Sequence, residues 1–135
     1  MLTDPDATSR AEPIKAQMCH WIITGLTLTT TSSALAAMTD FPHFVLAEKE
    51  GQGKQNLTEI MEYLPPTPPP KTGYHRYVFV LLAPEEGKRS RELQKPKERP
   101  HWGYGEQGKG VEEWAEENGL RAVGAEFFYS EHEEQ

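Results

Sequence analysis

The sequence predicts one mainly β domain that spans residues 1–135. Three observations point to this class. Eleven prolines and eleven glycines divide the chain into short segments, which disfavours a helix bundle. Short runs of β-branched and aromatic residues lie between these breakers, as expected for strands. A length of 135 residues leaves room for one modest hydrophobic core.

The first elements are short. Residues 2–6 read as the end of a strand that runs into a turn, because aspartates on both sides of Pro5 favour side-chain to backbone hydrogen bonds. Residues 20–24 form an apolar run closed by Gly25, which predicts a strand. Residues 29–53 look like an insertion, and their pattern predicts no particular structure.

The second half gives stronger signals. Residues 65–70 contain five prolines around Thr67 and favour extended polyproline geometry, as a rigid wall beside the strand that follows. Residues 74–82 predict that strand. Its part from 77 to 82 is almost wholly apolar, so we expect it to be covered on both faces.

Residues 84–110 read as a long charged loop. Apolar residues at 111, 114 and 115 have helical spacing, and the Asn-Gly pair at 118–119 is a typical stop, so residues 111–120 predict a helix. Residues 122–129 predict a last strand, followed by an acidic tail.

Charge and composition exclude several functions. The net charge of −7 opposes binding to nucleic acid, and the basic stretch at 88–99 is interrupted by glutamates and reads as a solvated loop. Cys19 is the one cysteine, so no internal disulfide can form. The most apolar region, 21–38, is broken by threonines and serines and predicts no transmembrane segment. With aspartates ahead of the first basic residue there is no secretory signal pattern, and we expect a cytoplasmic protein.

Three separated segments carry the candidate chemistry: Asp-Pro-Asp-Ala-Thr-Ser-Arg at 4–10, His-Trp-Ile-Ile at 20–23, and Pro-Pro-Lys-Thr-Gly-Tyr-His-Arg-Tyr-Val-Phe at 69–79. The imidazoles of His20 and His75 and the phenol of Tyr77 can all donate to a phosphate or carboxylate oxygen. A carboxylate such as Asp4 can accept from an imidazole and fix its tautomer. Gly73 allows a tight turn just before His75.

The order and spacing of these segments resemble the phosphatidylethanolamine-binding protein family, and Phe-Phe-Tyr at 127–129 is similar to its fungal branch. The resemblance covers nearly the whole chain. It implies a Greek-key β-sandwich with one or two peripheral helices and a small anion-binding pocket. The ligand-binding residues that it implies are Asp4, Asp6, His20, Pro69, Gly73, His75 and Tyr77.

The chain also departs from the family pattern. Thr8 stands where the family usually has proline, and Thr67 where many members have a glycine that lines the pocket. Compared with the family, the chain begins in what should be an internal strand, so we expect an N-terminally truncated sandwich with exposed sheet edges.

The resemblance implies a protein that binds a phospholipid headgroup or a small acidic ligand, with a serine carboxypeptidase or a kinase as protein partner. The alternative is an accessory or catalytic protein in a fungal polyketide pathway that couples anhydride intermediates, as in maleidride formation. Neighbours on a strand point to opposite faces, so Cys19 and His20 cannot act as a nucleophile and base. We therefore assign no catalytic residue and favour a binding protein over an enzyme. The sequence implies no cofactor, and the histidines lack the tight spacing of a metal site.

Overall fold

The computed structural model describes three stretches of the chain: residues 1–26, 57–87 and 92–134. The chain divides into two units, one of Met1–Ile23 with Glu59–Gln135 and one of Thr24–Thr58. Only the ends of the second unit are described, so the fold below is that of the first. The insertion expected at residues 29–53 lies outside the described residues.

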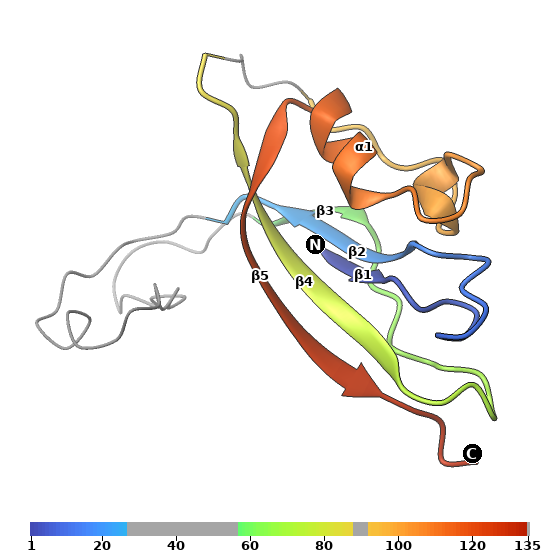
Figure 1. Cartoon of the computed structure of the whole chain (residues 1–135). Coiled ribbons are helices and arrows are strands. Elements are labelled where there is room, and N and C mark those ends of the chain that lie inside the picture. The colour runs from blue at the N-terminus through green and yellow to red at the C-terminus, as the bar shows by residue number, and fades with distance from the viewer. Residues whose placement is uncertain (27–56, 88–91, 135) are drawn as a thin grey trace, which may run out of the picture. The chain divides into compact units, whose positions relative to one another are not determined.

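Five strands form one sheet in the order β3-β2-β1-β4-β5 (Figure 1). Their bounds are Leu2–Asp4 for β1, Met18–Thr24 for β2, Thr58–Met61 for β3, His75–Pro84 for β4 and Leu120–Ser130 for β5. The short β1 lies in the middle, antiparallel to both β2 and β4. β4 and β5 are antiparallel along their whole length. The prediction of a mainly β fold is confirmed.

The helix α1, Val111–Glu117, is the longest helix among the described residues. It begins where the Glu113 carboxylate accepts the amide of Gly110 at 2.8 Å. It ends at Asn118 and at Gly119, whose φ of +66° favours glycine. The predicted helix is confirmed in place, but it stops before Leu120 because that residue begins β5.

The hydrophobic core lies between the sheet, α1 and the loop that precedes α1. Its buried members are Cys19, Ile22, Met61, Trp102 and Trp114. The indole nitrogens of both tryptophans are satisfied, Trp102 by the Thr3 hydroxyl at 3.2 Å and Trp114 by the Gln94 carbonyl at 2.8 Å. The long charged loop expected at residues 84–110 therefore supplies a core residue, Trp102, on the 3₁₀ turn His101–Gly103.

The prediction that residues 77–82 are covered on both faces is wrong. Phe79 is 42% exposed, and most of its neighbours along β4 are only partly buried. Leu82 packs against the core cluster, whereas Phe79 does not belong to it. In the described part of the chain, the core therefore covers β4 unevenly, and the apolar run reflects strand propensity as much as burial.

Candidate functional site

The side chains of Asp4 and His75 form a buried pair between two central strands. Asp4 ends β1 and His75 begins β4, and Asp4 Oδ2 lies 2.9 Å from His75 Nδ1. The side chains are only 4% and 1% exposed, respectively. A carboxylate accepts only, so Nδ1 of His75 carries the proton.

The other nitrogen of His75 meets a turn. Thr72 Oγ1 lies 2.9 Å from His75 Nε2 and 2.7 Å from the carbonyl oxygen of Pro69. Because that carbonyl can only accept, the Thr72 hydroxyl donates to Pro69, and Thr72 accepts from Nε2 when Nε2 carries a proton. Every bond in the chain Asp4–His75–Thr72–Pro69 is satisfied when the imidazole carries both protons. Gly73 follows with a φ of +72°, the backbone that the sequence required of a glycine there.

His20 approaches the same group from β2. Its ring meets that of Tyr77 edge to face, with centroids 5.1 Å apart. Its Nδ1 lies 2.8 Å from the carbonyl oxygen of Leu64 and donates to it, because a carbonyl can only accept. Burial lowers the pKa of His20, although the Leu64 carbonyl and the Asp4 carboxylate oppose that shift. The structure therefore favours His20 in its neutral form.

Tyr77 lies at the centre of the aromatic contacts. It is 1% exposed, and its ring stacks on those of His75 and Phe128 with centroids 6.4 and 5.4 Å away. Burial raises the pKa of the Tyr77 phenol above its ordinary value, and the charge of Asp4 raises it further. The phenol therefore stays protonated.

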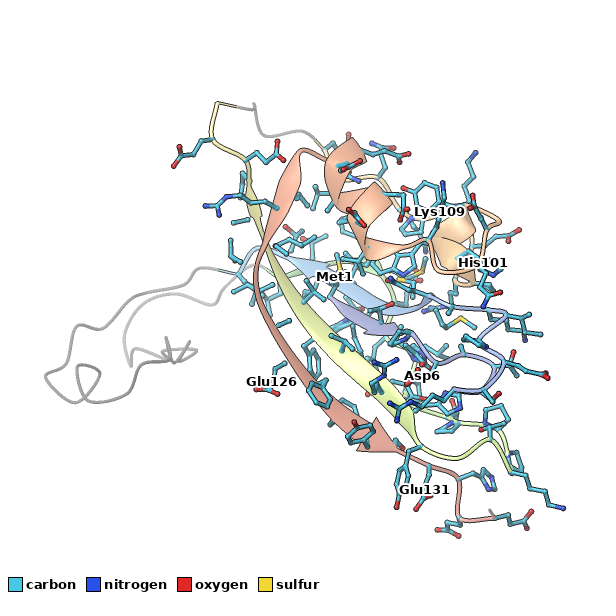
Figure 2. All side chains as sticks on the ribbon, viewed as in Figure 1. Met1, Asp6, His101, Lys109, Glu126 and Glu131 are labelled. Carbon is cyan, nitrogen blue, oxygen red and sulfur yellow. The ribbon has the colours of Figure 1, made fainter. Side chains whose placement is uncertain are left out.

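Asp6 acts on this cluster through Asp4. Its amide donates to Asp4 Oδ1 at 2.7 Å. Its carboxylate accepts from the amide, Nε and Nη2 of Arg76 at 2.7–2.8 Å. Burial alone would raise the pKa of Asp6, but the hydrogen bonds and charge of Arg76 hold it below its ordinary value. Figure 2 shows Asp6 in the turn after β1. This clamp fixes the turn that carries Asp4.

The structure thus brings Asp4, His20, His75 and Tyr77 together as the sequence predicted. Asp6 and Gly73 lie in the supporting turns. Pro69 contributes its carbonyl, while its ring is exposed and the buried proline of this stretch is Pro68. The assignment of these residues to ligand binding stays a prediction.

Sequence reasoning missed four supporting residues: Leu64, Thr72, Arg76 and Arg99. Thr72 and Arg76 lie inside the third motif, so their proximity could have been anticipated. Leu64 contributes only a backbone carbonyl, which leaves no signal in a sequence. Arg99 was assigned to a solvated loop, yet its guanidinium donates to the carbonyls of Cys19 at 3.1 Å, His20 at 3.3 Å and Glu62 at 2.9 Å.

The geometry does not resemble a nucleophile with its base. Cys19 lies in the core beside Trp102, on the other side of β2 from the contact of His20 with Tyr77. Burial raises the pKa of the Cys19 thiol to about 12, so no thiolate forms near neutral pH. The Thr72 hydroxyl donates to the Pro69 carbonyl at 2.7 Å, so its proton is not committed to His75 as a general base would need.

Among the described residues, no three histidine, cysteine, aspartate or glutamate side chains are grouped so that they could hold a metal ion. The described helices include none with the length and apolar character to span a membrane.

Comparison with known proteins now adds independent information. A family model described as phosphatidylethanolamine-binding protein matches residues 1–128. Carboxypeptidase Y inhibitor of Saccharomyces cerevisiae is 37% identical over 131 residues, which cover 97% of this chain and 58% of the inhibitor. A second protein of that yeast, the uncharacterized protein YLR179C, is 33% identical over 98% of this chain and 58% of its own length.

Solved structures agree with these matches. The crystal structure of carboxypeptidase Y inhibitor complexed with the cognate proteinase matches with a TM-score of 0.68 and 32% identity, covering 95% of this chain and 56% of that one. A phosphatidylethanolamine-binding protein from Plasmodium vivax matches with a TM-score of 0.58 at 18% identity over 95% of this chain and 60% of that one, which supports the fold alone. The chain therefore spans less than two thirds of the length of these relatives.

Proposed function

Because this chain belongs to the phosphatidylethanolamine-binding protein family, we propose that it is a binding protein that captures and inhibits a serine carboxypeptidase. The observation that supports this proposal is the 37% identity to yeast carboxypeptidase Y inhibitor along 97% of the chain. The relative that was solved with its cognate proteinase favours the same class of partner. Since the chain spans 58% of the inhibitor, the experiment must use this chain by itself.

Carboxypeptidase Y is the probe for that experiment. The purified chain is added in increasing concentration to the enzyme during hydrolysis of a peptide substrate, and binding is measured separately on immobilised enzyme. We expect saturable binding and a parallel loss of hydrolysis. An unrelated serine endopeptidase and the heat-unfolded chain serve as controls. If the chain neither binds nor inhibits the enzyme at micromolar concentrations, the proposal is contradicted. Binding without inhibition would limit the proposal to capture of the enzyme.

We also propose that the cluster of Asp4, His20, His75 and Tyr77 binds the phosphate or carboxylate group of a ligand. The observation in favour is the contact between Thr72 and His75, in which Nε2 of the buried ring lies 2.9 Å from the hydroxyl of a partly exposed turn. A ligand oxyanion that displaced this hydroxyl would make a charge-assisted bond to Nε2, which is stronger than a bond to a neutral hydroxyl.

Isothermal titration calorimetry tests this second proposal with three probes. Phosphoethanolamine represents a phospholipid headgroup, inorganic phosphate a simple anion and acetate a carboxylic acid. Thr72→Ala removes the competing hydroxyl and should tighten binding, whereas His75→Gln should abolish it. Lys95→Gln is the control, because Lys95 forms an exposed pair with Glu62 at 2.9 Å outside this cluster. Circular dichroism confirms that each variant is folded. Binding that is unchanged in folded His75→Gln would exclude this cluster.

A further inference from the structure

Among the described strands, the last strand of the sheet has one long edge that no other strand covers. β5 has eleven residues, Leu120–Ser130, and closes the strand order next to β4 (Figure 1). Within the described residues, no strand pairs with its other side. β5 contains neither proline nor lysine, two residue types with which natural edge strands block pairing. Such an edge is a template for another strand.

Two hydrogen bonds show which residues in the distal half of β5 face outward. The amide of Val80 donates to Met1 at 3.0 Å, so Val80 turns toward β1 and its β5 partner Ala125 turns outward. The amide of Phe127 donates to the side chain of Glu126 at 3.0 Å instead of to β4. Outward and inward residues alternate in an antiparallel ladder, so both observations agree.

The register changes in the proximal half of β5. The pairs Leu81 with Gly124 and Leu82 with Ala122 leave Val123 as an extra residue. Beyond it, the amide of Glu85 donates to the carbonyl of Gly119 at 2.9 Å, so Gly119 faces β4. The alternation then turns residues 120 and 122 outward. The outward set is therefore Leu120, Ala122, Ala125, Phe127 and, by the same alternation, Tyr129.

Two opposite charges stand on one face of this strand. Arg121 pairs with Ala83 and Glu126 pairs with Phe79. Phe79 and Ala83 are four residues apart on β4, where no extra residue intervenes, so their side chains point to the same face. Arg121 and Glu126 share that face and are both exposed. No ion pair of Arg121 is found in the described part of the chain, and Figure 2 shows Glu126 on the outer strand.

We propose that β5 pairs edge to edge with β5 of a second copy of this chain. The strands run antiparallel about a two-fold axis that passes between Val123 and Gly124. In this register Arg121 lies opposite Glu126 of the second copy, and the reciprocal pair forms across the axis. The amide of Phe127 then donates to the backbone of the second copy, which releases Glu126 to bind arginine.

Hydrogen bonding and charge select the same register. In this register Leu120 lies opposite Phe127 of the second copy, and Ala122 lies opposite Ala125. Residues whose backbone groups face outward therefore meet one another along the interface. Both copies contain the extra residue Val123, so the pairing register is the same on both sides of the axis. A register shifted by one residue would place outward-facing backbone groups of one strand opposite residues of the other strand whose backbone groups face inward. A register centred on Glu126 would place like charges opposite each other, which is destabilising.

Sedimentation equilibrium of the full chain tests the proposal with charge reversal. The wild-type chain should form dimers. Arg121→Glu and Glu126→Arg should each place like charges together and raise the dimer dissociation constant at least about tenfold, a loss of roughly 1.4 kcal/mol. The double variant R121E/E126R restores both pairs and should restore the dimer. A monomeric wild type, which would leave the edge free or occupied by another segment, overturns the proposal. Single variants that associate like the wild type, or a double variant that stays monomeric, overturn it as well.

Disulfide trapping tests the register itself. Directly opposed residues that are not hydrogen-bonded have Cα atoms about 4.5 Å apart, within the range of a disulfide. The variant R121C/E126C should therefore form a covalent dimer under mild oxidation. The control R121C/A125C places its cysteines on opposite faces of the sheet. It should run as a monomer in non-reducing gel electrophoresis. Native Cys19 is buried and should not interfere. Equal trapping of both variants would exclude this register.

Discussion

Asp4 and His75 are 71 positions apart in the sequence, yet Oδ2 of Asp4 lies 2.9 Å from Nδ1 of His75. The pair joins β1 to β4 at the point where the Thr72 turn meets the sheet. It therefore connects the local geometry of a turn to the pairing of two central strands. Four predictions follow from this cluster and from the core beside it.

Removing one partner of the buried pair should strongly destabilise the chain. Asp4→Asn or His75→Gln leaves the other side chain buried without its hydrogen-bonded partner, and such losses cost about 3–5 kcal/mol. Urea unfolding followed by tryptophan fluorescence measures the change. The double variant should cost less than the sum of the single variants, because the two residues interact directly. Lys95→Gln breaks an exposed pair with Glu62 and should leave the unfolding midpoint almost unchanged.

The clamp between Asp6 and Arg76 should make stability depend on pH in the acid range. The pKa of Asp6 lies below its ordinary value of 3.8, so its contribution is complete above that value and is lost as pH falls through the folded-state pKa. Asp6→Asn should therefore be less stable than wild type by a constant amount near pH 6. That difference should shrink below about pH 3.8, close to the pKa of an unfolded aspartate. A pH-independent difference in urea unfolding would contradict the role of the charge.

His20 should titrate below its ordinary value of 6.5, because burial disfavours its cation. Long-range proton–nitrogen NMR spectra should show the Nδ1-protonated neutral tautomer at pH 7. Since the folded pKa is the lower one, the stability that neutral His20 contributes is present above pH 6.5 and declines as pH falls. His20→Gln assigns the signal and should flatten that decline. A midpoint above 6.5 would show that an anion or water stabilises the cation.

Gly110 should tolerate no side chain. A Cβ at this position would lie 2.8 Å from both Gln17 Oε1 and Trp102 Cδ1. Gly110→Ala should therefore shift a buried tryptophan and cost about 1–3 kcal/mol, with a changed near-ultraviolet circular dichroism spectrum. Gly105→Asn is the matched control, since its left-handed backbone suits asparagine and no atom lies within 4 Å of the added Cβ.

The sequence predicts those elements whose signal is local. The apolar runs that became β2 and β4 and the helical spacing of α1 are readable in isolation. β3 is not, because Thr58–Met61 is short, mostly exposed and defined by its place beside β2. Trp102 was overlooked because it stands in a charged stretch, and only the folded chain shows its contact with Trp114.

The candidate site follows the same division. Residue types and motif spacing bring Asp4, His20, His75 and Tyr77 together. They do not reveal that the Thr72 hydroxyl already lies 2.9 Å from Nε2 of His75 while it donates to the Pro69 carbonyl. The sequence predicts two imidazoles that can donate to a ligand. In the structure the neutral form of His20 is favoured, and His75 contacts Asp4 and Thr72 through its two nitrogens.

The central position of β1 has a consequence for folding kinetics. Its partner on one side, β2, follows within a short stretch, whereas its partner on the other side is β4. Strand pairs so distant in sequence require slow closure of a large loop, so the rate-limiting step should be the docking of β4 onto a β1–β2 hairpin. During translation the nascent chain must expose that hairpin, with Asp4 unpaired, until His75 has left the ribosome. Pulse-labelling hydrogen exchange should accordingly detect late protection of the β1 and β4 amides.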